Sequence, residues 1–194
     1  MVPSGDRRRT AALAVGLLAV TLRAMGGADS PEVPQAHAHH QHMLATAPKL
    51  TQSRQSYAVP DALLLDEQGR PVALRTLLSP DRPVILNFIY TSCTTICPVM
   101  TGTMLQVQRQ LADTPHAPTY VSLSIDPDFD VPMVLKSYAQ RYGADWRFLT
   151  GTPTEITAVL RNFDAWRGSK ANHAALTLMR AAHDAQWTRL EGLA

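Results

Sequence analysis

Cys93 and Cys97 are the only thiols of this 194-residue chain, and Pro98 follows the second directly. A thiolate attacks disulfides and binds soft metals, and the unpaired N–H groups at the start of a helix favour that form. The pair could therefore be a structural disulfide, a redox couple or part of a metal site. As a disulfide it would close a very small loop and would stabilise the fold only at the low end of ~2–4 kcal/mol.

The position of the cysteines favours chemistry over a structural disulfide. Residues 84–90, VILNFIY, are a near-continuous apolar run, typical of a strand buried on both faces. Cys93 follows this run and Cys97 opens a predicted helix, and sites in α/β sheets collect beyond the carboxyl ends of strands. The apolar face of that helix is predicted to carry Met100, Met104, Val107 and Leu111. The two methionines are soft donors, but their spacing indicates core packing.

The remaining elements alternate along the chain. The pattern predicts a first hairpin around 67–71, strands at 118–125 and 146–150, and a closing hairpin around 183–184. Asp130 could cap the helix after the first of these strands, and Thr152 with Glu155 forms a capping box for the next helix. This order predicts an α/β, thioredoxin-like fold, with a central mixed sheet flanked by helices and an N-terminal β-hairpin.

The N-terminal part has a different composition. Residues 1–28 join an arginine run to a short apolar run and a small-residue tail, which indicates a secretory signal peptide or an uncleaved anchor. Residues 29–56 are interpreted as a flexible His-rich tether, and 57–194 as the globular domain. Without the first 28 residues, 14 basic residues face 15 acidic ones, so no basic surface for nucleic acid is expected.

Two blocks resemble the Sco/SenC family of copper chaperones of cytochrome c oxidase assembly. They are NFIYTSCTTICPVM at 87–100 and SLSIDPDFDVPMVLKSYAQRYGADWRFLTG at 122–151. The resemblance implies a thioredoxin-like fold that binds one copper ion through both motif cysteines and one distant histidine. The family's histidine stands just before a late strand, and ANHAALTLMR matches that context at His173. A strand antiparallel to 84–90 would place His173 on the cysteine side, whereas His183 falls in the turn that follows.

Two thiolates and an imidazole form a soft set of low coordination number. Cu(I) accepts three such ligands and Cu(II) could add a further donor, whereas structural zinc usually needs four protein ligands. Asp126 could be a second-shell acceptor for His173 or an occasional fourth ligand, or it could simply begin an Asp-Pro turn. The tether's histidines could bind copper or zinc weakly, or belong to a solvated linker; they are His37, His39, His40 and His42.

The resemblance implies a copper chaperone of the bacterial periplasm, soluble or held at the inner membrane only by an uncleaved N-terminal anchor. It would pass copper by ligand exchange to the dinuclear copper site of an oxidase subunit or a similar cupredoxin domain, and an upstream copper donor could supply it. It would not be an enzyme in the strict sense. Departures from the family are Ala174 after the histidine, an unusual closing turn, and an end at Ala194 before the final helix of most relatives.

The alternative is a thiol–disulfide oxidoreductase that reduces the cysteines of the copper acceptor with Cys93 and Cys97 as its redox pair. Thioredoxin-type enzymes use a Cys-x-x-Cys motif facing a cis-proline. Here the spacing is three residues, and His173 stands where that proline would be. These two differences favour metal binding, although both roles can coexist.

Overall fold

The computed structural model describes residues 50–193. Eight strands form one mixed sheet in the order β1-β8-β7-β4-β5-β6-β2-β3. The strands are β1 (Thr51–Gln55), β2 (Leu63–Asp66), β3 (Pro71–Ala73), β4 (Val84–Ile89), β5 (Thr119–Ser124), β6 (Arg147–Thr150), β7 (Leu176–Arg180) and β8 (Trp187–Glu191). The helices are α2 (Leu74–Leu77), α3 (Ile96–Leu111), α4 (Pro132–Tyr142), α5 (Pro153–Asn162) and the 3-10 turn η1 (Lys170–Asn172). The structure confirms the predicted α/β class, the mixed sheet and the N-terminal hairpin, β2–β3.

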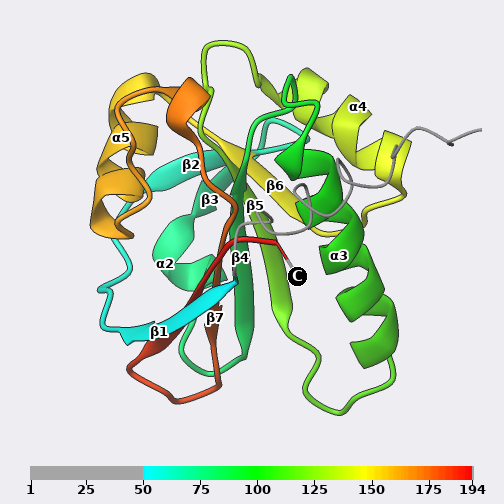
Figure 1. Cartoon of the computed structure of the whole chain (residues 1–194), viewed down its shortest axis with the longest axis vertical. Helices are drawn as coiled ribbons and strands as arrows, with labels where there is room; N and C mark the ends of the chain where they lie inside the picture. Colours follow the sequence, from blue (N-terminus) through cyan, green and yellow to red (C-terminus); the bar gives the residue numbers. More distant parts are fainter. Residues whose placement is uncertain (1–49, 194) are drawn as a thin grey trace, which may run out of the picture. The chain divides into compact units, whose positions relative to one another are not determined.

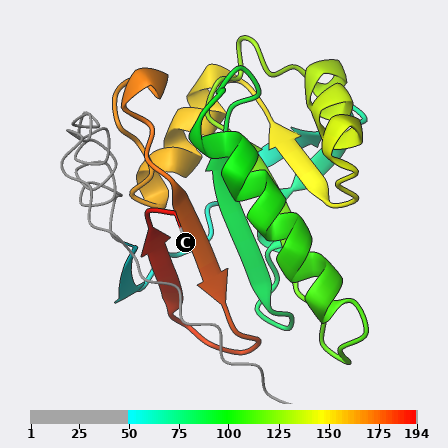
Figure 2. The ribbon, with the colours of Figure 1, turned by 45° about the vertical axis from the view of Figure 1, so that its right-hand side comes forward.

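β4 lies at the centre and is covered on both faces, as its apolar run predicts. Leu86 and Phe88 belong to the core shared with α2 and α5, whereas Ile89 belongs to the core shared with α3 and α4. Figure 2 shows α3 and α5 on opposite sides of the sheet. Because successive strand residues point to opposite faces, this continuous run fills two cores at once.

The direction of the strands decides which loops meet. β4, β5 and β6 run parallel, and β7 runs antiparallel to β4, with Asn87 paired to Thr177. The chain therefore enters β7 at the edge where β4 ends. The loop after β4, the β5–α4 connection and η1 all lie at the upper end of the sheet in Figure 1. The expected placement of His173 on the cysteine side is confirmed at the level of topology.

Two predictions were wrong. Residues 51–55, assigned to the tether, form β1, which pairs with β8. All five β1 side chains are exposed, so this edge strand is held by backbone hydrogen bonds and leaves no apolar pattern in the sequence. Asp130 does not cap α4: the cap position is Val131, without a side-chain bond, and the Asp130 carboxylate binds elsewhere.

Other local predictions hold. The capping box of Thr152 and Glu155 opens α5. Met100 and Met104 are buried, as their spacing predicts, and they line an apolar hollow of about 140 Å³ between α3 and β7–β8. Within residues 50–193, no helix is both long and apolar enough to cross a membrane. The predicted signal segment 1–28 and the tether's four histidines lie outside the described residues.

Candidate metal centre

The two cysteines lie in the turn between β4 and α3, and both thiols are free. Cys93 is 7% exposed and its backbone N–H donates to the Tyr90 carbonyl at 3.1 Å. Cys97 is fully buried in the first turn of α3, and its N–H donates to Cys93 Sγ at 3.4 Å. The Thr95 hydroxyl lies 3.7 Å from the same sulfur. The start of the helix thus directs hydrogen-bond donors at the Cys93 thiol and buries the Cys97 thiol.

The surroundings shift the pKa values of the two thiols in opposite directions. Burial opposes ionisation of Cys93, but hydrogen bonds from Cys97 and Thr95 outweigh it and lower the pKa of the Cys93 thiol to about 7. Burial raises the pKa of the Cys97 thiol far above its ordinary range, and the neighbouring Cys93 adds to this effect. Near neutral pH, therefore, Cys93 is the nucleophilic, metal-seeking sulfur and Cys97 keeps its proton.

Asp130 fastens the cysteine loop to the β5–α4 connection. Its buried carboxylate accepts the Thr91 N–H at 3.1 Å, the Thr91 hydroxyl, and the Ser124 hydroxyl at 2.6 Å. Burial raises the pKa of this carboxyl, while the bonds from Ser124 and Thr91 oppose the rise. Sequence reasoning missed this role because a helix cap and a tertiary acceptor share the same signature, an aspartate just before a helix.

His173 directly follows η1, and its N–H donates to the Lys170 carbonyl at 3.1 Å. Burial lowers the pKa of its imidazole to about 4, against an opposing backbone hydrogen bond at Phe88, and the charge of Arg167 lowers it further. The ring is therefore neutral at physiological pH, which is the form that binds metals. Its buried Nε2 has no hydrogen-bond partner among the described residues. An orphaned imidazole nitrogen on the cysteine side suits a soft metal ion.

Tyr90 touches both halves of the centre. Its ring meets the edge of the His173 ring with centroids 5.8 Å apart, and it also contacts the Cys93 thiol, which helps to raise the Tyr90 pKa after the larger effect of burial. Across residues 50–193, no three His, Cys, Asp or Glu side chains are grouped closely enough to hold a metal as they stand. The donor types fit copper, but binding by all three residues requires them to come closer together than they lie in this structure. Sequence reasoning gave Tyr90 no chemical role.

Asp126 meets the histidine segment through Lys170, whose ammonium pairs with the Asp126 carboxylate. The Asp126 carbonyl also accepts the N–H of Phe129 at 3.1 Å and of Asp130 at 2.8 Å, so the expected Asp-Pro turn is present. The role of Asp126 as a second-shell acceptor stays a prediction. His183 lies in the β7–β8 turn, at the other end of β7 from the centre.

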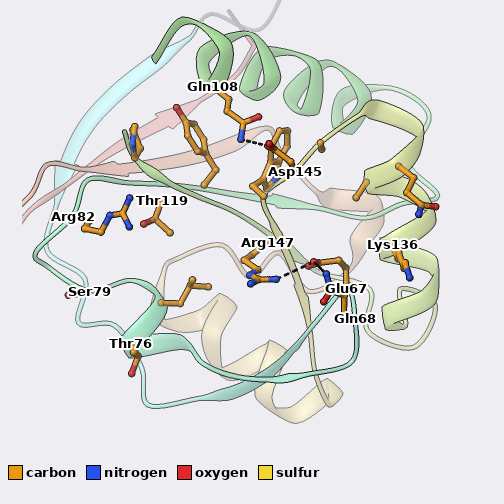
Figure 3. A pocket seen from close by; sticks show the side chains of 17 residues that line it. Glu67, Gln68, Thr76, Ser79, Arg82, Gln108, Thr119, Lys136, Asp145 and Arg147 are labelled. Carbon is orange, nitrogen blue, oxygen red and sulfur yellow. Dashed lines mark hydrogen bonds and ion pairs between the residues drawn. The ribbon is translucent and has the colours of Figure 1, made fainter. Parts of the chain in front are cut away.

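A larger hollow of about 910 Å³ lies where β5 and β6 begin, at the opposite end of the parallel strands (Figure 3). Two contacts join residues that line it: Arg147 pairs with Glu67 at 3.4 Å, and Gln108 donates to Asp145. We call this hollow the polar groove. The sequence predicted no site there.

Most of the described part of the chain matches a known protein family. The SCO1/SenC family model matches residues 51–185. A "SCO1 protein homolog" of Bacillus subtilis is 34% identical over 115 residues, which cover 57% of this chain and 58% of the relative. The chain spans about half the length of the curated relatives it matches.

Solved structures give the same fold. BsSco, described as a member of the Sco family of cytochrome c oxidase assembly proteins with a disulfide switch, superposes with a TM-score of 0.61 at 27% identity, covering 74% of this chain and 88% of that one. A copper-bound ScoI of Arabidopsis thaliana has a TM-score of 0.58 at 20% identity, covering 70% and 88%, and so shows the fold alone. The predicted thioredoxin-like, Sco-type fold is confirmed.

Proposed function

Because the chain belongs to the SCO1/SenC family, we propose that it is an exported copper-binding protein of oxidase assembly that holds one ion at Cys93, Cys97 and His173. The observation that carries the proposal is the buried, unpartnered Nε2 of a neutral His173 on the cysteine side of the sheet. An imidazole nitrogen left without a partner costs free energy unless a ligand satisfies it. The description of BsSco as a member of a family of cytochrome c oxidase assembly proteins supports the process.

The two thiols would play different parts in holding copper. Cys93, with a pKa of about 7, offers a thiolate near neutral pH, whereas Cys97 must lose its proton when the metal binds. Transfer would proceed by ligand exchange with a copper-accepting oxidase subunit, the acceptor's ligands replacing those of the donor one at a time. No substrate bond is broken, so the protein would act as a chaperone and not as an enzyme.

We also propose roles for three features outside the ligand set. Residues 1–28 would direct export to the periplasm, either as a cleaved signal or as an inner-membrane anchor. The histidines of the tether, His37 to His42, would bind copper weakly. Asp126, whose carboxylate pairs with Lys170 in this structure, would accept a hydrogen bond from His173 or act as an occasional fourth ligand.

The test is a Cu(I) titration of the reduced full chain in competition with a chelator. We expect one tightly bound ion, and at least a tenfold loss of affinity in His173→Ala, because an imidazole ligand is removed. The matched control is His183→Ala, which removes an exposed histidine from the β7–β8 turn. Equal affinity in His173→Ala and the parent would remove His173 from the ligand set.

The second candidate function is thiol–disulfide exchange with the acceptor's cysteines. Two observations favour it. The Cys93 thiol has a lowered pKa, and the backbone N–H of Cys97 donates to the Cys93 sulfur, which places a second cysteine beside it. In this reaction the acceptor disulfide would be reduced to two thiols as Cys93 and Cys97 form a disulfide, and an external thiol reductant would restore the pair. Rapid turnover of a protein disulfide by copper-free protein with dithiothreitol as reductant would support this function.

A further inference from the structure

A group of exposed apolar side chains lies beside the candidate metal centre. Phe129, Val131 and Met133, in the β5–α4 connection and the first turn of α4, are 53%, 45% and 77% exposed. We call these three residues the apolar rim. Single exposed apolar side chains are ordinary, but three within five residues form a patch of the kind that marks interaction sites.

The apolar rim borders a hollow that reaches the cysteine loop. This hollow has a volume of about 360 Å³. It is lined by Thr91 and Ser92 of the cysteine loop and by Phe129, Met133, Val134, Ser137, Tyr138 and Arg141. Ser92 immediately precedes Cys93 in the chain. We call this hollow the rim pocket. Its lining is mainly apolar, and its volume suits one large side chain of a partner protein.

The rim is fixed in place relative to the thiols. Asp130 stands in the chain between Phe129 and Val131, and its carboxylate holds the N–H and hydroxyl of Thr91. The Asp130 N–H in turn donates to the Asp126 carbonyl at 2.8 Å. A patch pre-organised in this way loses little conformational entropy when a partner binds.

The surface around Lys170 has a different character. There the charged pair Lys170 and Asp126 lies beside His173, and the Lys170 ammonium is 5.9 Å from the centre of the Tyr90 ring. A protein that approaches Cys93 would therefore meet apolar surface on the side of α4 and charged surface on the side of η1. An apolar patch next to a charged one resembles the core and edge of a protein interface.

We propose that the apolar rim and the rim pocket are the docking surface for the copper-accepting domain, which places an apolar side chain beside its own thiolate and imidazole ligands into the rim pocket. This inference rests on the proposed function. Ligand exchange brings acceptor donor atoms within bonding distance of an ion held by Cys93, so the acceptor must cover the surface next to that thiol. The apolar rim is the part of this surface that gains most from being covered.

The experiment measures copper transfer from the full chain and from a rim variant, Phe129→Ser/Met133→Ser. The probe is the purified, copper-free dinuclear-copper domain of a bacterial oxidase subunit, and a small Cu(I) chelator is the second acceptor. We expect transfer to the protein domain to slow by about tenfold or more, because truncation of central apolar contacts has effects of this size. Transfer to the chelator should not change, since the chelator needs no docking surface.

The matched control is Leu63→Ser, which removes a 60% exposed apolar side chain from β2, remote in the sheet order from β4. It should transfer copper to both acceptors at the parental rate. Equal transfer to the protein domain by the parent and the rim variant would overturn the docking surface and leave the proposed function intact. Absence of transfer from the parent itself would overturn the proposed function as well.

Two further outcomes would also contradict the inference. If the rim variant slows transfer to the chelator as much as transfer to the domain, the rim acts on the metal centre and not on docking. If the parent forms dimers in size-exclusion chromatography and the rim variant does not, the rim binds a second copy of the chain.

Discussion

The two ends of the parallel strands differ in their chemistry, and the volumes of the hollows at these ends do not reflect that difference. The polar groove at the amino ends is the larger hollow, and two of its charged side chains, Arg147 and Glu67, pair with each other. The cysteine end has less empty space, but it holds a thiol with a lowered pKa and an imidazole nitrogen without a partner. The presence of soft metal-ligand types, and not the volume of the hollow, distinguishes the cysteine end of this sheet.

The largest expected effect concerns copper. Cys97→Ser should lower the affinity for Cu(I) by more than about 100-fold, because loss of a ligand exceeds the effect of losing an outer-shell partner. Gln108→Ala, at the polar groove, should bind copper as the parent does. Both can be measured by competition with a chelator. A large loss of affinity in Gln108→Ala would mean that the two ends are coupled.

The second prediction concerns the stability of the groove end. Asp66 is buried and accepts hydrogen bonds from the backbone N–H groups of Gln68 and Arg70, both at 2.9 Å, and it pairs with Arg147. Asp66→Ala should lower the free energy of unfolding by about 3 kcal/mol, since it leaves buried donors and charge unpaired. Urea denaturation measures this loss, and copper affinity below the midpoint should be unchanged. Reduced copper affinity in the folded variant would show that the polar-groove end and the cysteine end are not independent.

The third prediction is a dependence of stability on pH at the cysteine end. The pKa of His173 is lowered from its ordinary 6.5 to about 4, so as the pH falls below 6.5 the unfolded chain takes up a proton that the folded chain does not. Between pH 6.5 and 4 this should cost up to about 3 kcal/mol of stability in the copper-free protein. His173→Asn should lose less stability than the parent over that range, as measured by urea denaturation at each pH. Identical pH profiles would show that the imidazole is not buried in the neutral form.

The smallest effect concerns thiol reactivity. Alkylation of Cys93 by iodoacetamide should be half-maximal near pH 7 and rise with pH, because the thiolate is the reactive form. Near neutral pH its thiolate fraction should be roughly fifteenfold that of an ordinary thiol with a pKa of about 8.5. Cys97 should resist alkylation until the protein unfolds. Mass spectrometry of the modified peptides distinguishes the two cysteines. Equal labelling would show that their thiols do not differ in reactivity.

Much of the fold follows from apolar patterning. The run at 84–90 predicted β4, and the spacing of Met100 and Met104 predicted the buried face of α3. β1 escaped prediction because its side chains are all exposed, and patterning detects burial and not backbone pairing.

The candidate centre was predicted less completely than the fold. The resemblance identified its three proposed ligands, and the topology places their segments at one edge of the sheet. The roles of Asp130 and Tyr90 depend on contacts with residues distant in the chain or across a loop, such as the bond from Thr91 to Asp130. A single sequence contains no signal for such contacts, because each residue type also has an ordinary local role.

The bond between Thr91 and Asp130 has a mechanical consequence. Asp130 stands between the rim residues Phe129 and Val131, and Thr91 lies two residues before Cys93, so their hydrogen bond joins the two loops. Binding of a partner to the rim would therefore affect the cysteine loop through this hydrogen bond. Slower hydrogen exchange at the Thr91 amide on docking would reveal the transmission, and unchanged exchange would mean that the two loops move independently. A docked partner that stabilises this hydrogen bond would therefore act on the cysteine loop as well as on the rim.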